Sequence, residues 1–449
     1  MSEHKKNILC IGAGYVGVPS MAMIAYKCPD CRVTVADIDH SRINAWDSSV
    51  LPIYEPGLNE IIQKTRNINL FFSTDIEKGI KTNDIIFVCV NTPTKKYGVG
   101  AGEATDLQFL EKVIRQIGKY SESSKIIVEK STVPVKTCVF IEKILRSESK
   151  QHFDVLSNPE FMAEGTAIND LEFPSRVVIG SKDDTSGINA RNELVEIYSA
   201  WVPREKIITT NLWSSELSKL AANAFLAQRI SSINAISALC ERTGADVAEI
   251  SRSIGMDDRI GGKFLNAGVG FGGSCFKKDI LSLVYLCKCY GLDEVAAYWE
   301  NVLSINEYQQ KRFTGEIIKA CNSLDGKKVC VLGCAFKADS DDIRESPALG
   351  IISQLLIERA HITISDPKAL SNAAAHFGNA VTYEIDPYEA AKNSYAVIIL
   401  TGWCVFKELD YAEIYQSMKK PAYIFDGRNI IDCRKCKEIG FEVYSIGKG

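Results

Sequence analysis

The chain has 449 residues and a formal net charge of −4, so it is too long for one ordinary hydrophobic core and lacks the basic excess that nucleic acids and anionic lipids attract. Hydrophobic residues make up 46% and charged residues 24%, which is typical of a folded globular protein. No apolar run approaches the roughly 20 residues that a membrane span needs. We therefore expect two or three domains that bind neither nucleic acid nor membrane.

The fifteen cysteines are scattered through apparent strands and helices, for example at Cys89, Cys240 and Cys330. An odd number placed in this way is typical of a reduced, cytoplasmic chain rather than of a disulfide scaffold. Two CxxC pairs occur, at Cys28–Cys31 and Cys433–Cys436, but no histidine lies at ligand spacing from either of them. The sequence therefore predicts a cytoplasmic protein without a metal site.

The first part of the chain, residues 1–211, alternates short apolar runs with amphipathic stretches. This rhythm predicts βαβ units around a mostly parallel sheet. The expected strands are Asn7–Ile11, Arg32–Ala36, Ile85–Val90, Lys125–Glu129, Asp154–Ser157 and Val177–Ile179. We interpret this part as one α/β domain.

The middle part, residues 212–323, changes to a helical pattern. The run from Leu212 to Glu241 contains neither proline nor glycine, and Gly244 follows in a helix-ending context. One buried face is predicted by the apolar positions at four-residue spacing, Leu217, Ala221 and Phe225. A second helical stretch is expected from about Lys278 to Lys319. A long helix between two domains is a natural dimerisation surface.

The strand–helix rhythm restarts at Leu324–Lys328 and continues through residues 324–449. Four more strands are expected, at Lys328–Leu332, His361–Ser365, Ala396–Leu400 and Ala422–Phe425. The predicted fold is therefore α/β, with two Rossmann-like doubly wound domains joined by a central long-helix region.

A glycine turn follows the first expected strand and consists of Gly12, Ala13, Gly14, Tyr15, Val16 and Gly17. The first glycine permits a tight turn, the second lets the backbone approach a pyrophosphate, and the third allows the helix to pack closely on the strand. Asp37 ends the second strand and is placed to accept hydrogen bonds from the adenosine ribose, where its charge repels a 2′-phosphate. NAD is therefore favoured over NADP, although the nearby Arg42 softens that preference. With this motif, residues 1–211 are interpreted as an NAD-binding, Rossmann-like domain.

The second informative segment is Val269–Asp279, in which several glycines precede Cys275. A cysteine at the start of a helix and beside lysines is expected to have a lowered pKa and to be partly thiolate. Lys278 and Asp279 follow Cys275 by three and four positions and so share its helical face. The pattern predicts a nucleophile, a cation and a base within reach of one another, against the alternative of a buried structural cysteine.

Two further groups of residues are candidates for the same site. Lys219 and Asn223 are four apart on the long helix among apolar neighbours, and burying such a pair is costly unless it contacts a ligand or a partner charge. The segment Asn158–Phe161 follows a strand end, where sites of α/β proteins usually lie. Glu160 and Glu164 are therefore candidates for acid/base or ribose-binding roles, although each alone could be a surface acid.

A cysteine nucleophile in an NAD enzyme favours a particular chemistry. Simple alcohol dehydrogenation needs a base but no thiol. A thiol can capture an aldehyde as a thiohemiacetal, which is then oxidised to a thioester and hydrolysed. The combination predicts that an alcohol is converted to a carboxylate in two hydride transfers that consume two NAD.

With these motifs in order, the chain resembles the UDP-glucose/GDP-mannose dehydrogenase family over essentially its whole length. The segments that carry the resemblance are Gly12–Gly17, Val90–Thr94, Glu129–Pro134, Asn158–Glu164, Ser215–Asn223, Gly270–Asp279, Gly333–Lys337, Arg344–Pro347 and Asp426–Arg428. The run from Asn211 to Arg242 is similar to the eukaryotic-type enzymes that act on UDP-glucose. The resemblance implies oxidation of UDP-glucose to UDP-glucuronate with two NAD.

The resemblance also implies catalytic roles. Cys275 would be the nucleophile, and Lys219 with Asn223 would stabilise the developing oxyanion. Asp279 would position or activate water, and Glu160 would be the acid/base for thioester hydrolysis.

Binding roles follow from the same resemblance. Besides the glycine turn, the implied NAD contacts are Asp37, Arg42, Val90, Asn91, Thr92, Pro93, Thr94, Ser131, Thr132, Glu164, Lys278 and Arg344. The implied sugar-nucleotide contacts are Glu160, Phe161, Glu164, Lys219, Asn223, Arg259, Gly270, Phe271, Gly272, Phe336, Lys337 and Arg428.

Arg259 resembles an arginine that reaches across a subunit interface, which implies a homo-oligomer built from dimers, with a hexamer as one such assembly. From charge alone, Lys337, Arg344 and Arg428 predict a diphosphate clamp.

Three alternatives remain open from the residues. The same chemistry could act on another nucleotide sugar, such as GDP-mannose or a UDP-hexosamine. A simple two-electron hydroxyacid dehydrogenase could use Lys219 as its base, with Cys275 incidental. A non-catalytic NAD-binding scaffold is the third alternative, and the presence of all the proposed reacting groups argues against it.

Overall fold

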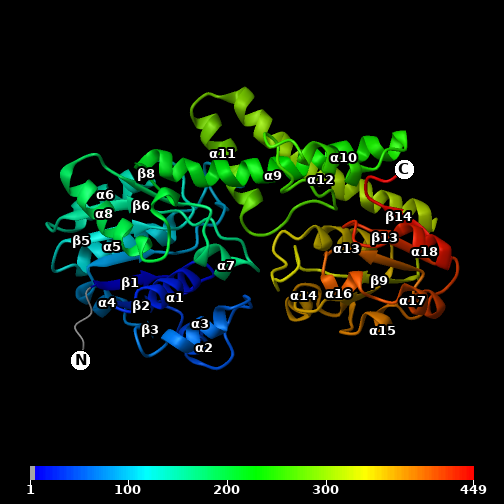
Figure 1. Ribbon diagram of the computed structural model, residues 1–449, viewed down its shortest axis with the longest axis horizontal. Helices are drawn as coiled ribbons and strands as arrows, with labels where there is room; N and C mark the ends of the chain where they lie inside the picture. Colours follow the sequence, from blue (N-terminus) through cyan, green and yellow to red (C-terminus); the bar gives the residue numbers. More distant parts are fainter. Residues whose placement is uncertain (1–5) are drawn as a thin grey trace. The chain divides into compact units, whose positions relative to one another are not determined.

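The structure of the protein is a computed structural model that describes residues 6–449 and divides into two compact units (Figure 1). The first unit contains the residues up to 222 together with 281–289, and the second contains 223–280 and 290–449. Each unit is built around its own sheet.

The first unit contains an eight-stranded sheet in the order β3-β2-β1-β4-β5-β6-β7-β8. All neighbours pair in parallel except β6 and β7, which are antiparallel. The strands are β1 (Lys6–Ile11), β2 (Cys31–Ala36), β3 (Leu70–Ser73), β4 (Ile85–Val88), β5 (Lys125–Glu129), β6 (Phe153–Ser157), β7 (Val177–Ser181) and β8 (Ile207–Asn211). The order reverses between β1 and β4, which is where ligands bind in doubly wound sheets.

Helices cover both faces of this sheet. They are α1 (Gly17–Lys27), α2 (His40–Asp47), α3 (Leu58–Thr65), α4 (Ile76–Thr82), α5 (Gln108–Tyr120), α6 (Thr137–Glu148), α7 (Ala167–Glu172) and α8 (Thr185–Ser199), with the 3₁₀ turn η1 (Arg204–Lys206) before β8. Successive side chains of β1 alternate between two buried clusters, since Ile8 and Cys10 belong to one and Leu9 and Ile11 to the other. Both faces are therefore buried, as expected for strands that read as continuous apolar runs.

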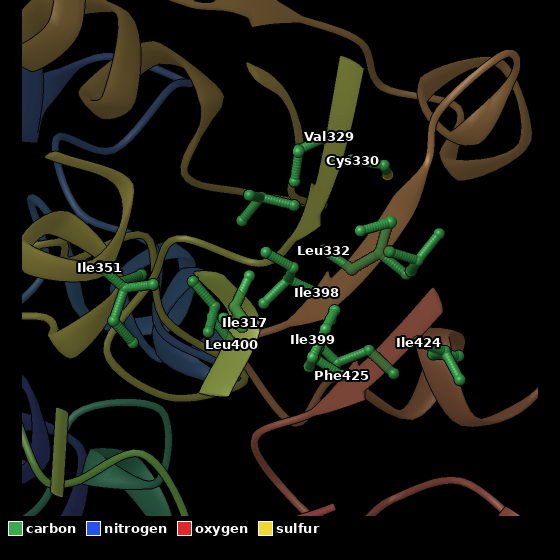
Figure 2. Packing of buried hydrophobic residues seen from close by; sticks show 14 of the residues in the cluster. Ile317, Val329, Cys330, Leu332, Ile351, Ile398, Ile399, Leu400, Ile424 and Phe425 are labelled. Atoms are coloured by element: carbon green, nitrogen blue, oxygen red, sulfur yellow. The ribbon is translucent and has the colours of Figure 1, made fainter. Parts of the chain in front are cut away.

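The second unit contains a six-stranded, fully parallel sheet in the order β11-β10-β9-β12-β13-β14. Its strands are β9 (Lys328–Leu332), β10 (His361–Ser365), β11 (Thr382–Tyr383), β12 (Ala396–Ile399), β13 (Tyr423–Asp426) and β14 (Glu442–Ser445). Around it lie α13 (Pro347–Ile357), α14 (Leu370–Phe377), η2 (Gly378–Ala380), α15 (Pro387–Ala391), α16 (Cys404–Lys407), α17 (Tyr411–Ser417) and α18 (Cys433–Ile439). Figure 2 shows Ile317 and Ile351 packed with side chains of the central strands.

The remaining helices are α9 (Leu212–Thr243), α10 (Val247–Gly255), α11 (Phe276–Cys289) and α12 (Asp293–Cys321). Gly244, with a φ of +76°, ends α9 as predicted. The prediction of one helical stretch from Lys278 to Lys319 is wrong, because α11 and α12 are separate helices. Gly291, between them, has a φ of +68°, and this left-handed backbone interrupts the helical path.

The predicted buried face of α9 is also wrong. Leu217 is 42% exposed and Phe225 is 60% exposed in this chain. The buried line instead contains both apolar and polar side chains, namely Ser215, Glu216, Lys219, Leu220, Asn223, Ala224 and Ala227. Polar residues can lie there because they have partners. Glu216, for instance, accepts hydrogen bonds from the Lys136 and Cys138 amides, each at 2.7 Å.

The predicted α/β fold with two Rossmann-like sheets and a helical region between them in the chain is confirmed. Within residues 6–449, none of the helices combines the length and the apolar character that crossing a bilayer requires.

Candidate active site

The glycine turn lies between β1 and α1, at the carboxyl edge of the first sheet. Gly12 has a φ of +115°, and its amide donates to the Ala36 carbonyl at 2.8 Å. A Cβ at Gly12 would lie 2.3 Å from the Cys89 carbonyl oxygen, and one at Gly17 would lie 2.1 Å from the Gly12 carbonyl oxygen. A Cβ at Gly14, in contrast, would meet no atom within 4 Å. The turn therefore packs tightly at its first and third glycines and has open space at the second, which fits a dinucleotide phosphate.

Asp37 lies directly beside this turn. Its Oδ2 accepts the Ala13 amide at 2.8 Å, and its Oδ1 accepts the Asp39 amide at 3.0 Å. Arg42 Nη1 lies 3.4 Å from Oδ2. A carboxylate has about four acceptor positions, so two backbone hydrogen bonds leave Asp37 able to accept from ribose hydroxyls as well.

Other predicted NAD contacts gather at the same sheet edge. Thr92, after β4, is buried and donates from Oγ1 to the Thr132 carbonyl at 2.8 Å. Ser131, after β5, is held by its amide, which donates to Glu129 Oε1 at 2.7 Å. Since β1, β4 and β5 are neighbours in the sheet, these loops lie beside the glycine turn, at the point where the strand order reverses.

Glu160 lies in the loop that follows β6, and its carboxylate is held by several donors. Oε1 accepts the Phe161 amide at 2.8 Å and the Met162 amide at 3.2 Å. Oε2 lies 2.9 Å from Lys130 Nζ and accepts the Ser20 hydroxyl at 3.3 Å. Burial alone would raise the pKa of Glu160, but the Lys130 ammonium and the backbone donors outweigh it and hold that pKa below its usual value. The geometry favours an ionised carboxylate, and neither Lys130 nor its contact was predicted from the sequence.

The predicted substrate residues Lys219 and Phe161 lie near this carboxylate. Lys219 is only 8% exposed, and its Nζ lies 5.4 Å from the centre of the Phe161 ring. The guanidinium of Arg176 lies 3.8 Å from the centre of the same ring. The Lys219 charge contributes to lowering the pKa of Glu160. The structure thus brings together Glu160, Phe161 and Lys219, as the sequence motifs predicted.

Glu55 links the glycine turn to the loop after β6 and was not predicted. Its carboxylate is hydrogen-bonded by the Tyr15 hydroxyl, and it accepts the Gly165 amide at 2.7 Å and the Ala167 amide at 2.6 Å. Burial, the Glu55 hydrogen bond and the nearby Glu164 raise the pKa of Tyr15. Tyr15 and Glu164, both predicted NAD contacts, are therefore neighbours.

Cys275 directly precedes α11 in the second unit, and it is exposed. This is the predicted position at a helix start, and its Sγ lies 3.7 Å from the Ser274 hydroxyl. The glycines before it pack closely on the loop after β9. A Cβ at Gly272 would lie 2.5 Å from the Glu345 carbonyl oxygen, and one at Gly273 would lie 2.9 Å from the Phe336 ring. Only glycine fits at these two places, so the segment that carries Cys275 has a defined path.

Asp279 is almost completely buried, at 1% exposure. Its Oδ2 accepts the side-chain amide of Asn223 at 2.6 Å, and Lys278 Nζ lies 3.1 Å from its Oδ1. The structure therefore joins Asp279 and Asn223 into a buried pair, a contact that the sequence did not predict although both residues were candidates. Lys278 provides the charge that compensates the buried carboxylate.

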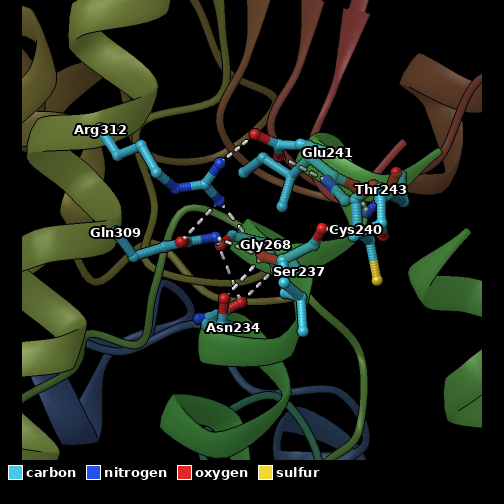
Figure 3. Close-up of polar contacts among 12 residues, drawn as sticks. Asn234, Ser237, Cys240, Glu241, Thr243, Gly268, Gln309 and Arg312 are labelled. Atoms are coloured by element: carbon cyan, nitrogen blue, oxygen red, sulfur yellow. Dashed lines mark hydrogen bonds and ion pairs between the residues drawn. The ribbon is translucent and has the colours of Figure 1, made fainter. Parts of the chain in front are cut away.

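The glycine-rich loop before Cys275 is held through its backbone by α9 and α12. Gly268 donates to Asn234 Oδ1 at 2.9 Å, and its carbonyl accepts from Gln309 Nε2 at 2.8 Å (Figure 3). Asn306 accepts the Phe271 amide at 2.8 Å and donates to the Phe271 carbonyl at 3.1 Å. Figure 3 also shows Arg312 reaching Glu241, an ion pair that joins α12 to α9. These contacts fix the loop that was predicted to hold the sugar nucleotide.

Arg428 is the most enclosed of the predicted phosphate-binding cations. Its guanidinium donates to the carbonyls of Leu400 at 2.7 Å, Gly270 at 3.1 Å and Phe336 at 3.4 Å. Burial lowers the pKa of Arg428 to about 10, against the opposing charge of Asp426. Arg428 thus joins its own loop to the loops of Gly270 and Phe336, which carry predicted substrate contacts, and to Leu400.

The other predicted cations of this unit have more exposed positions. Arg344 pairs with Asp342 through Nη2 at 2.7 Å, and Arg259 pairs with Asp257 at 2.6 Å with 89% of its side chain exposed. Lys337 Nζ lies 5.8 Å from the centre of the Phe336 ring. The diphosphate clamp and the interface role of Arg259 stay predictions. Within residues 6–449, no group of three or more His, Cys, Asp and Glu side chains is arranged to hold a metal ion.

Three family models match the chain in sequence order. The NAD binding domain of the UDP-glucose/GDP-mannose dehydrogenase family matches residues 6–202, its central domain matches 213–308, and its UDP binding domain matches 330–433. The chain belongs to this family. The prediction of an NAD-dependent nucleotide-sugar dehydrogenase is therefore confirmed.

Individual members of the family are similar over nearly the whole chain. UDP-glucose 6-dehydrogenase 4 of Arabidopsis thaliana is 56% identical, and UDP-glucose 6-dehydrogenase 4 of Oryza sativa subsp. japonica is 55% identical. Both alignments cover 98% of this chain and 97% of the relative. A UDP-glucose dehydrogenase from the archaeon Pyrobaculum islandicum aligns structurally with a TM-score of 0.88 at 31% identity, covering 100% of this chain and 98% of its own.

Proposed function

We propose that this protein oxidises UDP-glucose to UDP-glucuronate with two NAD. The observation that carries the proposal is an exposed cysteine at the start of α11 in a chain whose first sheet bears a dinucleotide turn. The high identity to relatives named UDP-glucose 6-dehydrogenase supports the choice of sugar nucleotide. NAD, when bound at the glycine turn, accepts one hydride in each of the two oxidations.

The reaction balances as one primary alcohol, two NAD⁺ and one water giving one carboxylate, two NADH and three protons. After the first oxidation, the Cys275 thiolate adds to the aldehyde carbon, and the resulting thiohemiacetal loses a second hydride to become a thioester. Water then attacks the thioester carbon, the C–S bond breaks, and the thiolate leaves. A thioester route explains why the enzyme would need a cysteine at all.

The remaining catalytic roles follow from charge and burial. We assign stabilisation of the oxyanion to Lys219 and Asn223, because a buried cation and a buried amide donor suit a developing negative charge. Asp279, paired with Asn223, would position or activate water. Glu160 would accept the proton of the water that hydrolyses the thioester, a role that needs an ionised carboxylate.

The C-terminal domain, residues 324–449, would bind the UDP part of the sugar nucleotide. The loop after β6 and the Gly270–Gly272 loop would supply further contacts. We assign the diphosphate to Lys337, Arg344 and Arg428, and the sugar to Phe161, Lys219 and the Gly270–Gly272 loop. The NAD contacts would be those predicted around the glycine turn, with Asp37 on the adenosine ribose. The domain boundaries at residues 211 and 323 stay part of this proposal.

We also propose that the protein forms homo-oligomers built from dimers and is cytoplasmic. Large apolar side chains are exposed on the central helices, with Phe225 and Leu239 at 60% on α9 and Tyr298 at 54% on α12. Exposed apolar side chains of this size favour a protein partner. All fifteen cysteines are free in the structure, which suits a reducing compartment.

A substrate panel tests the choice of sugar nucleotide. NADH formation would be measured under identical conditions with three sugar nucleotides, UDP-glucose, GDP-mannose and a UDP-N-acetylhexosamine, and with a small hydroxyacid. We expect UDP-glucose to give the highest kcat/KM by a wide margin. A higher kcat/KM for either of the other two would replace UDP-glucose as the substrate, while a hydroxyacid substrate preferred over all three would remove the nucleotide-sugar proposal.

A further inference from the structure

Lys130 is a buried lysine that none of the proposed steps uses. It directly follows β5 and is 2% exposed. Its Nζ lies 2.9 Å from Glu160 Oε2, and it donates to Asn158 Oδ1 and to the Tyr198 hydroxyl, each at 3.2 Å. An ammonium group has three protons and no acceptor, so these three partners match its hydrogen-bonding capacity.

The partners of Lys130 are themselves fixed. The Tyr198 hydroxyl donates to Asn158 Oδ1 at 2.7 Å, while Asn158 Nδ2 donates to the Val178 carbonyl at 2.8 Å. Because Asn158 Nδ2 donates to the Val178 carbonyl, the Oδ1 end of the amide is the one that accepts from Lys130. The ammonium therefore has one arrangement, and Glu160 Oε2 is its anionic partner in that arrangement.

Because Glu160 is largely buried, its charge depends on this ion pair. A buried carboxylate without a partner would take up a proton rather than remain charged. Burial lowers the pKa of Lys130, but the charge of Glu160 and its hydrogen bond outweigh this effect and raise that pKa above its usual value, so Lys130 stays protonated. The titratable and charged groups around this ion pair include Cys10 on β1, Cys89 after β4, Arg176 before β7, Tyr198 on α8 and Lys219 on α9.

Lys130 forms an ion pair with Glu160, with 2.9 Å between Nζ and Oε2. Lys219 and Arg176 lie against the Phe161 ring, where a bound sugar nucleotide would change their surroundings. Lys130, in contrast, is 2% exposed and contacts Asn158, which directly follows β6, and Tyr198 of α8.

We propose that Lys130 is the positioning residue for Glu160, fixing its carboxylate and keeping it ionised so that it can accept the proton of the water that attacks the thioester. The inference rests on the proposed function, because Lys130 can act in hydrolysis only if Glu160 does. Lys130 does not contact the reacting atoms, and its effect passes through the carboxylate. A lysine that merely stabilised the fold would not move the pH dependence of hydrolysis.

The test uses Lys130→Met, which keeps the length of the side chain and removes its charge. Without the ammonium, burial raises the pKa of Glu160, so the acidic limb of the kcat–pH profile should move upward by at least about one pH unit. At a pH on the acidic limb of the unmodified protein we expect kcat to fall about tenfold, and to recover as the pH rises. The KM for UDP-glucose should stay within about twofold, and the thioester on Cys275 should accumulate in intact-protein mass spectra.

Lys125→Met is the matched control. Lys125 is the first residue of β5, the strand that Lys130 follows, is 4% exposed, and donates to the Lys81 carbonyl at 3.4 Å. It therefore tests the loss of a buried lysine next to β5 without the loss of the Glu160 ion pair. Its acidic limb should match that of the unmodified protein, and a shift equal to that of Lys130→Met would overturn the inference.

Two more variants separate the inference from the proposed function. Glu160→Gln should trap the thioester, and adding Lys130→Met to it should change kcat little further. If Glu160→Gln turned over at the normal rate, the proposed role of Glu160 would be wrong. If Glu160→Gln trapped the thioester while Lys130→Met kept a normal acidic limb, the role of Glu160 would stand and the inference about Lys130 would fall.

Tyr198→Phe keeps the inference testable if Lys130→Met does not fold. It removes one of the three acceptors of Lys130 and the donor to Asn158 with minimal change in shape. We expect a smaller upward shift of the acidic limb in the same direction. An unchanged or downward-shifted limb in this variant would contradict the inference.

Discussion

The two sheets of this protein begin with the same local structure and use it differently. In each, a strand ends in a glycine with positive φ, Gly12 at +115° and Gly333 at +94°. In each, an aspartate at the end of the adjacent strand accepts the amide of the next residue at 2.8 Å: Asp37 from Ala13, and Asp366 from Cys334. The first six strands of the first sheet and all six of the second also share one order.

The difference lies in what surrounds the aspartate. Asp366 has no exposed surface, and it also accepts the Ala335 amide at 3.1 Å and the Trp403 indole N–H at 3.3 Å. Asp37 keeps 9% exposure, and Gly14 next to it opens onto free space. The second turn is therefore part of the packing, whereas the first has room for a ligand. A shared topology does not by itself give a shared ligand, because the ligand depends on the side chains around the turn.

The largest expected effect concerns Cys275, which lies in the unit that has no open dinucleotide turn. Cys275→Ser should lower kcat by at least about a thousandfold, because a serine hydroxyl remains protonated where a thiol can ionise. NAD affinity, measured by calorimetry, should change by less than about twofold, because the NAD contacts lie around the first turn. A large loss of NAD affinity would break the separation of roles between the two sheets.

The second prediction compares two glycines of the first turn. Gly17→Ala should lower the free energy of unfolding by about 3 kcal/mol, because its Cβ would lie 2.1 Å from the Gly12 carbonyl oxygen. Gly14→Ala should leave stability nearly unchanged and weaken NAD binding, because its Cβ would fill the open space. Chemical denaturation and NAD titration of both variants measure the two effects. An unchanged NAD affinity in Gly14→Ala would mean that the NAD phosphates do not lie beside Gly14.

The smallest expected effect compares the two aspartates. Asp37→Asn should weaken NAD binding about tenfold, the loss expected for a charged hydrogen bond to a ribose, with a modest change in stability. Asp366→Asn should instead lower the free energy of unfolding by about 2 kcal/mol and leave NAD affinity unchanged, because it replaces a buried acceptor by an amide N–H donor that faces backbone N–H donors. An effect of Asp366→Asn on NAD affinity would contradict the distinction between the two turns.

Much of the fold was predictable because its central strands are continuous apolar runs. The four strands that the sequence did not predict are β3, β8, β11 and β14, and all four lie at sheet edges. Edge strands pair on one side only and are partly exposed, so their patterns carry less hydrophobic signal. β11 contains only two residues.

The buried face of α9 was not predictable from apolar spacing, because the true buried face contains polar residues that have partners elsewhere in the chain. Glu216 is one example, since its partners are the amides of Lys136, directly before α6, and of Cys138, on α6. The candidate site shows the same limit. The glycine turn, Asp37 and Cys275 have local motifs, whereas Lys130 and Glu55 become recognisable only when the fold brings their distant partners to them.

The ratio of NADH formed to UDP-glucose consumed tests the central claim most directly. The account requires two hydride transfers per sugar, one from the alcohol and one from the thiohemiacetal on Cys275. At completion with limiting UDP-glucose and excess NAD, it therefore predicts two NADH per UDP-glucose and one equivalent of carboxylate product. A ratio of one, with an aldehyde or ketone product, would contradict it.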